Sequence, residues 1–81
     1  MKHKLKILQK YAELHLTNRK FWEIRKFDRD YKIGDSIDFI ICNNETSEPI
    51  KGISSYNRNI DYVFLGGIYG LEEGYCILSV S

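Results

Sequence analysis

Short segments in which polar and apolar residues alternate, with one helical segment among them, constrain the fold of this chain most strongly. Alternation with period two is typical of strands, because successive side chains of a strand point to opposite faces of a sheet. Five segments alternate or are rich in β-prone residues: 3–8, 21–27, 36–42, 53–65 (with a bend near 57–59) and 75–80. The sequence therefore predicts an α+β fold that is mainly β.

The segment 9–18 changes from a period of two to a helical period. Leu8, Ala12 and His15, or alternatively Tyr11, Leu14 and Asn18, share one face of a helix, and no glycine or proline interrupts the segment. Asn18 is a suitable stop, because asparagine tolerates the left-handed conformation that often ends helices. We expect a helix of two or three turns directly after the first strand, with His15 as a packing or half-exposed residue.

Loops are expected at residues 33–35, a tight turn, at 43–49, which contain the only proline, and at 66–74, which contain four of the six glycines. The glycines at 66–74 do not predict a phosphate-binding loop, because neither Lys-Ser/Thr nor a helix follows them. One helix and five strands with short links favour a small closed or half-closed β-barrel, and 81 residues suit a single domain over 1–81.

The composition excludes several classes of protein. With 43% hydrophobic and 14% aromatic residues, the chain is too apolar for a disordered tail. No apolar run is long enough for a signal peptide or a membrane helix. Cys42 and Cys76 stand in separate apolar runs, which favours buried thiols in a reducing cytoplasm over a disulfide or a metal site. We expect a cytoplasmic protein without membrane contact.

The net charge of +1 conceals an asymmetry along the chain. Residues 1–32 contain ten lysines and arginines against four acidic residues, whereas residues 33–81 contain two against seven. An anionic partner is therefore expected to meet the first strand, the helix and the second strand.

The densest feature is the segment 20–31, in which aromatic and charged residues alternate. On a strand, Glu23 and Arg25 share a face and can form an ion pair, flanked by Phe21 and Phe27. Such a pair could receive a nucleobase, with arginine as donor, glutamate as acceptor from an exocyclic amine, and a ring for stacking. The alternative is an ion pair that only covers one end of a barrel.

The remaining candidates give weaker signals. His3, at the start of the first strand, could lie at the rim of a cleft. The segment 28–30 has two carboxylates but lacks the spacing of a calcium loop, so a charged turn ordered by Arg29 is favoured over a metal site. No Ser or Cys has an evident His and acid partner, so nucleophilic triad chemistry is not expected.

Longer motifs resemble those of a known family. They are His3-x-Leu5-Lys6-Ile7 followed by Tyr11, Lys20-x-x-Glu23-Ile24-Arg25-Lys26-x-Asp28-Arg29-Asp30-Tyr31-x-x-Gly34-Asp35, and Tyr62-Val63-x-x-Gly66-Gly67-x-x-Gly70-Leu71-x-x-Gly74-Tyr75-x-Ile77-Leu78. Together they resemble an uncharacterised family of small bacterial and phage proteins that belongs with the ASCH (activating signal cointegrator homology) domains of the PUA-like superfamily. The resemblance implies a PUA-like β-barrel with a helix after the first strand. It also implies a cleft lined by Lys20, Glu23 and Arg25 that binds RNA or a modified nucleoside.

Some ASCH-like relatives hydrolyse acetylated cytidine with a threonine nucleophile, a lysine and a glutamate. Their threonine falls between the lysine and the arginine of the motif, but residues 21–24 of this chain include no threonine. The resemblance therefore does not predict that hydrolase. An amidohydrolase of variant mechanism, with Glu23 as general base and Lys20 as electrostatic stabiliser, remains an alternative. A further alternative is an accessory protein of phage or mobile-element origin that binds another protein through its barrel edge.

The leading hypothesis from the sequence is an RNA- or nucleotide-binding module. RNA or a modified nucleoside or nucleotide is the expected partner, and no cofactor, metal or catalytic residue is assigned. The residues expected to contact RNA or nucleotide are His3, Lys6, Lys20, Phe21, Glu23, Arg25, Lys26 and Arg29.

Overall fold

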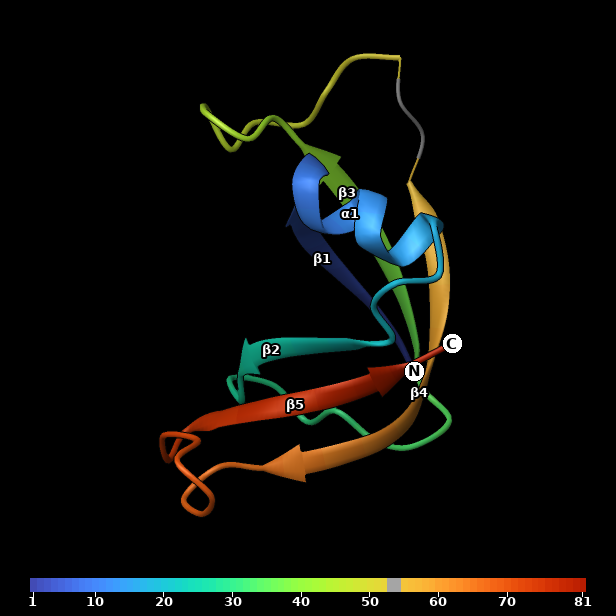
Figure 1. Ribbon diagram of the computed structural model, residues 1–81. Helices are drawn as coiled ribbons and strands as arrows, with labels where there is room; N and C mark the ends of the chain where they lie inside the picture. Colours follow the sequence, from blue (N-terminus) through green and yellow to red (C-terminus); the bar gives the residue numbers. More distant parts are fainter. Residues whose placement is uncertain (53–54) are drawn as a thin grey trace.

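A computed structural model describes residues 1–52 and 55–81, which form five strands and one helix (Figure 1). In chain order they are β1 (Lys2–Leu8), α1 (Gln9–Leu16), β2 (Trp22–Lys26), β3 (Ser36–Cys42), β4 (Tyr56–Leu65) and β5 (Tyr75–Val80). The predicted order of elements is confirmed, with small differences at their ends. Residues 53 and 54, the predicted start of the fourth β segment, lie outside the described residues.

The strands form a single sheet in the order β1-β3-β4-β5-β2, which curls into a half-barrel (Figure 1). β1 pairs with β3 in parallel, and the other three pairings are antiparallel. β4 pairs with β3 through its first residues and with β5 through its last, and its register shifts between Ile60 and Tyr62. β1 and β2 therefore form the two edges of the sheet.

The inner face of the half-barrel carries the hydrophobic core. Alternate residues of each strand point inward, as the period-two pattern predicts. The buried core side chains include Leu5, Ile7, Ile37, Phe39, Ile60, Cys76 and Leu78. Ala12 and His15 add the buried face of α1, which contacts β1 and β3. Both cysteines are buried free thiols, as predicted. The described residues contain no helix long and apolar enough to cross a membrane.

Two turns depend on residues with positive φ. α1 ends at Leu16, two residues before the predicted end, and Asn18 reverses the chain with φ of 58°. Gly34 has φ of 93° in the predicted tight turn before β3. Asp35, the next residue, accepts hydrogen bonds from the backbone N–H of Lys32 and from the amino group of Met1.

Buried His3 completes this cluster at the start of β1. Its Nε2 atom lies 2.8 Å from Oδ2 of Asp35, and its ring packs on Tyr31 with centroids 4.8 Å apart. The predicted position of His3 at the rim of a cleft is wrong, because its side chain is only 3% exposed. The physical reason is the alternation of β1, which places residue 3 in the same inward row as Leu5 and Ile7.

The hydrogen bond with His3, followed by that with the amino terminus, lowers the pKa of Asp35 from 3.8 to about 2. A carboxyl with a lowered folded-state pKa stabilises the fold above its unfolded pKa and loses that contribution as the pH falls. Asp35→Asn should therefore be less stable than the wild type at pH 7, and the difference should shrink as the pH falls from about 4 to about 2. Urea unfolding across this pH range tests this. A difference that does not vary with pH would contradict it.

Candidate functional site

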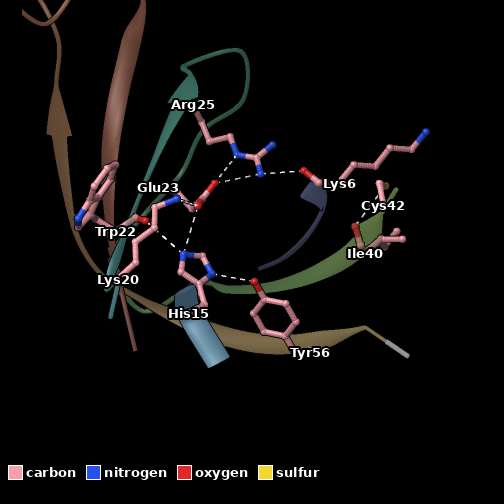
Figure 2. Close-up of polar contacts among 9 residues, drawn as sticks. All are labelled: Lys6, His15, Lys20, Trp22, Glu23, Arg25, Ile40, Cys42 and Tyr56. Carbon is pink, nitrogen blue, oxygen red and sulfur yellow. Dashed lines mark hydrogen bonds and ion pairs between the residues drawn. The ribbon is translucent and has the colours of Figure 1, made fainter. Parts of the chain in front are cut away.

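The two edges of the sheet are bridged by a side chain instead of by backbone pairing. β1 and β2 each pair with one strand only, β3 and β5 respectively. The Nη2 atom of Arg25, on β2, donates a hydrogen bond of 2.8 Å to the carbonyl oxygen of Lys6, on β1 (Figure 2). Arg25 therefore links two strand edges that would otherwise be open to solvent.

Glu23 contacts Arg25 and two further side chains, those of Lys20 and His15 (Figure 2). Its carboxylate is 6% exposed, and its Oε1 atom lies 2.6 Å from Nζ of Lys20 and 3.2 Å from Nε2 of His15. Its Oε2 atom lies 3.2 Å from Nε and 3.1 Å from Nη2 of Arg25. The predicted same-face ion pair of Glu23 and Arg25 is confirmed. Because both carboxylate oxygens already contact donors of the chain, Glu23 positions Lys20 and Arg25 and offers no vacant acceptor to a base.

His15 supports Glu23 from inside the barrel. Its Nε2 atom also lies 3.2 Å from the carbonyl oxygen of Trp22, and its Nδ1 atom lies 2.7 Å from the hydroxyl of Tyr56. Burial lowers the pKa of His15, which favours the neutral ring at pH 7. We assign the proton to Nε2, facing two acceptors, so that Nδ1 accepts from the Tyr56 hydroxyl. Burial also raises the pKa of Tyr56 and keeps that hydroxyl protonated. Of the two positions predicted for His15, packed or half-exposed, its burial confirms the first.

Three adjoining grooves follow β2, two of them along the gap between β1 and β2 and one between β2 and α1. The aromatic groove, about 450 Å³, lies between α1 and β2 and is lined by Tyr11, Leu14, Arg19, Lys20, Trp22, Glu23 and Ile24. The edge groove, about 310 Å³, is lined by Lys6, Ile7, Leu8, Tyr11, Glu23, Ile24, Arg25, Lys26 and Tyr75. The basic groove, also about 310 Å³, is lined by Lys4, Leu5, Lys6, Arg25, Lys26, Asp28, Arg29 and Tyr31. Shared lining residues make the three grooves continuous.

The basic groove holds positive charge that the chain does not neutralise. Among the described residues, no carboxylate lies within 4.0 Å of the ammonium groups of Lys4, Lys6 and Lys26. Arg29 has a distant partner in Asp28, at 3.8 Å. Arg25 uses Nε and Nη2 for Glu23 and Lys6, and within the described part of the chain its Nη1 makes no hydrogen bond. The groove can therefore bind anionic groups.

Lys20 connects the Glu23 cluster with the aromatic groove. Its Nζ atom lies 4.9 Å from the ring centroid of Tyr11 and 4.8 Å from that of Trp22, within the range of cation–π interactions. The sequence prediction did not include these two aromatic residues. Tyr11 belongs to the motifs that resemble the ASCH-like family, but nothing in the sequence gave it a role in binding. The alternation of β2 did place Trp22 opposite Glu23, on what proves to be the exposed face of the strand.

Six of the eight predicted contact residues line the grooves: Lys6, Lys20, Glu23, Arg25, Lys26 and Arg29. Phe21 is 54% exposed and lies outside the groove linings, and His3 belongs to the separate cluster with Asp35. Phe27, expected beside the ion pair, packs against the hydrophobic core. Tyr56 was missed because it is distant in sequence and reaches the cluster only through the fold.

Among the described residues, the hydroxyl in contact with the Glu23 cluster is that of Tyr56. Of the described Ser and Thr side chains, none hydrogen-bonds to Lys20, Glu23 or Arg25, and the hydroxyl of Tyr56 is turned toward His15. Within residues 1–52 and 55–81, no three His, Cys, Asp or Glu side chains gather in a way that could hold a metal ion. What the arrangement can do is bind an anion beside aromatic rings.

Comparison with known proteins identifies the family but gives no function. No curated protein was found to match the chain. The model of one protein family, described as a domain of unknown function (DUF3850), matches residues 2–80. Because this match spans nearly all of the 81 residues, the chain is a member of the DUF3850 family.

Proposed function

We propose that this domain binds single-stranded RNA or a nucleotide, with phosphate groups held in the basic groove. The resemblance of the segment 20–35 to ASCH domains supports RNA or a modified nucleoside as the ligand. A half-barrel with a helix after the first strand is compatible with the PUA-like fold that this resemblance implies. Within this proposal the domain is a binding module and not a hydrolase.

The observation that carries the proposal is the fixed position of Arg25. Two of its nitrogens are held by Glu23 and by the Lys6 carbonyl, so the side chain loses little further freedom when its third nitrogen donates to a ligand. Its side chain is 23% exposed and lines the basic groove. A planar guanidinium that is already oriented suits a phosphate oxygen, since charge-assisted hydrogen bonds to phosphate depend on direction.

The lysines around Arg25 extend this site along the groove. Lys4 and Lys6 come from β1 and Lys26 from β2, so their ammonium groups can follow a chain of phosphates between the two strand edges. Each lysine–phosphate contact releases a condensed counterion, which makes the affinity fall with salt by a log–log slope of about 0.7 per phosphate for single strands.

The proposal is tested by fluorescence anisotropy with a labelled ten-nucleotide uridine RNA. We expect Lys6→Ala/Lys26→Ala to bind about tenfold or more weakly at 50 mM salt, and its salt slope to fall by about 1 to 2 units. The matched control Lys2→Ala/Lys51→Ala removes two exposed lysines that do not line the grooves, and it should stay within about twofold of the wild type. Equal losses in both double variants, or no binding by the wild type at low salt, would refute the proposal.

A further inference from the structure

The outer face of the sheet around β5 carries large apolar side chains. This outer sheet face consists of Trp22, Ile24, Tyr62, Phe64, Tyr75 and Ile77. Trp22 on β2 and Tyr62 on β4 both lie opposite Ser79 of β5, so the two rings stand in one row with a short side chain between them. Adjacent strands are about 4.8 Å apart, so the two residues are separated by about 10 Å of sheet.

These residues are exposed although the opposite face of the same sheet is buried, so a small core does not explain their exposure. Trp22 is 47% exposed, Ile24 49% and Tyr62 57%, whereas Leu78, which points to the inner face of β5, is fully buried. β2 thus turns its apolar residues to solvent and its charged Glu23 to the interior, the reverse of the usual pattern for a strand with one buried face. Contiguous apolar surface of this kind marks an interaction site.

The loop between β4 and β5 extends this face. The ring of Tyr69 is 93% exposed and stacks on Phe64 with centroids 6.3 Å apart. Tyr69 has φ of 52°, a backbone conformation that is rare for a bulky residue. The fold therefore holds a fifth aromatic ring at the end of the outer sheet face, beside those of Trp22, Tyr62, Phe64 and Tyr75.

The outer sheet face is continuous with the positively charged gap between β1 and β2. Ile24, Lys26 and Tyr75 belong to this side of the sheet and also line the edge groove. Lys26 lines the basic groove as well. A chain whose phosphates lie beside Lys26 would therefore have its bases within reach of the exposed rings.

We infer that the outer sheet face is a stacking platform for the bases of single-stranded RNA, and this inference rests on the proposed function. Rings outnumber aliphatic side chains on the face, and every base has a π-face that an aromatic ring can stack on. Exposed aromatic residues on a sheet beside cations are how several RNA-binding domains hold unpaired bases. An apolar protein partner would account for the apolar area but not for the adjoining positive charge.

The experiment uses Trp22, the only tryptophan, as a reporter within the face. Ten-nucleotide uridine RNA should quench its fluorescence on binding, whereas an abasic strand of the same length should bind more weakly and quench little. Tyr62→Leu, which keeps an apolar side chain of similar exposure, should weaken RNA binding about fivefold or more, because stacking on one aromatic ring is lost. Tyr62→Phe should stay within about twofold of the wild type because it keeps the ring.

The outcomes separate this inference from the proposed function. Equal affinities for the abasic strand and the RNA, with no effect of Tyr62→Leu, would overturn the stacking platform and leave phosphate binding intact. If the wild type does not bind the RNA at all, both the stacking platform and the proposed function are wrong. If light scattering finds a dimer that Tyr62→Leu dissociates, the face is an interface between two copies and the stacking platform is wrong.

Discussion

Replacement of Glu23 by alanine is expected to lower the free energy of unfolding by about 3 kcal/mol, because it breaks a buried ion pair and leaves its cationic partners unmatched. The carboxylate is 6% exposed, and the ammonium of Lys20, 2.6 Å from it, belongs to a side chain that is 10% exposed. The variant also leaves the Nε2–H of His15 without one of its two acceptors. Urea unfolding at pH 7, followed by circular dichroism, measures the difference.

Asp38→Ala is the matched control for Glu23→Ala. Asp38 lies 3.4 Å from Nζ of Lys2, whose side chain is 59% exposed, and accepts a hydrogen bond of 2.9 Å from the side chain of Asn57, so its loss should cost about 1 kcal/mol. Glu23→Gln should fall between the two variants, since the amide keeps one acceptor but loses the charge. A loss for Glu23→Ala no larger than that for Asp38→Ala would contradict the role of Glu23 as the buried centre of the site.

Arg25→Lys is expected to weaken RNA binding about tenfold, although it keeps the charge, because an ammonium cannot reproduce the planar fork of donors. A lysine ammonium at the position of Nη2 could contact both Glu23 and the Lys6 carbonyl, but it would have no second nitrogen at the position of Nη1 to donate to a ligand. Affinity is measured by anisotropy at a temperature where unfolding curves show both proteins to be fully folded.

Arg58→Lys tests whether the effect is specific to the position. Arg58 lies on β4, with its guanidinium carbon 4.9 Å from the Tyr56 ring centroid, and it lines none of the three grooves. Its replacement should leave the affinity within about twofold of the wild type. If Arg25→Lys binds RNA as well as the wild type does, then only the charge at position 25 matters and the fixed guanidinium does not.

Much of the local structure could be predicted from the period of the side chains. β3 begins and ends where the alternation does, at Ser36 and Cys42. The same-face placement of Glu23 and Arg25 follows from period two alone. Some of the basic residues concentrated in 1–32 do come together in space, since β1 and the segment from β2 to Tyr31 line the basic groove, but α1, expected on the same surface, does not line it.

The sheet order and the second layer of the site could not be predicted in this way. No local sequence pattern determines that β1 pairs in parallel with β3, or that β2 lies at the far edge beside β5. Those pairings depend on how the whole sheet buries its inner face. The gap that Arg25 bridges is a consequence of that order. The contact of His15 with Tyr56 likewise joins residues 41 positions apart.

The inward position of Glu23 on β2 could not be predicted from hydrophobicity, which would place the apolar side chains of this strand inside. The sequence left two alternatives for Glu23, a hydrogen-bond acceptor for a base in a cleft or a member of an ion pair that covers one end of the barrel. Its burial follows from the donors that the fold assembles around it, namely Lys20, His15 and Arg25. Because Glu23 points inward, the alternation of the strand places Trp22 and Ile24 on the outer face. An aromatic surface therefore lies next to the basic groove.

The most direct test of RNA binding at the β1–β2 gap is to map the contact residue by residue. Amide chemical shifts of the labelled protein are followed by nuclear magnetic resonance during titration with ten-nucleotide uridine RNA at low salt. We expect the largest shifts at residues 4–6 and 22–29, and none above background at 43–52, the loop after β3. Shifts centred on that loop, or no shifts at any RNA concentration, would contradict the proposed site.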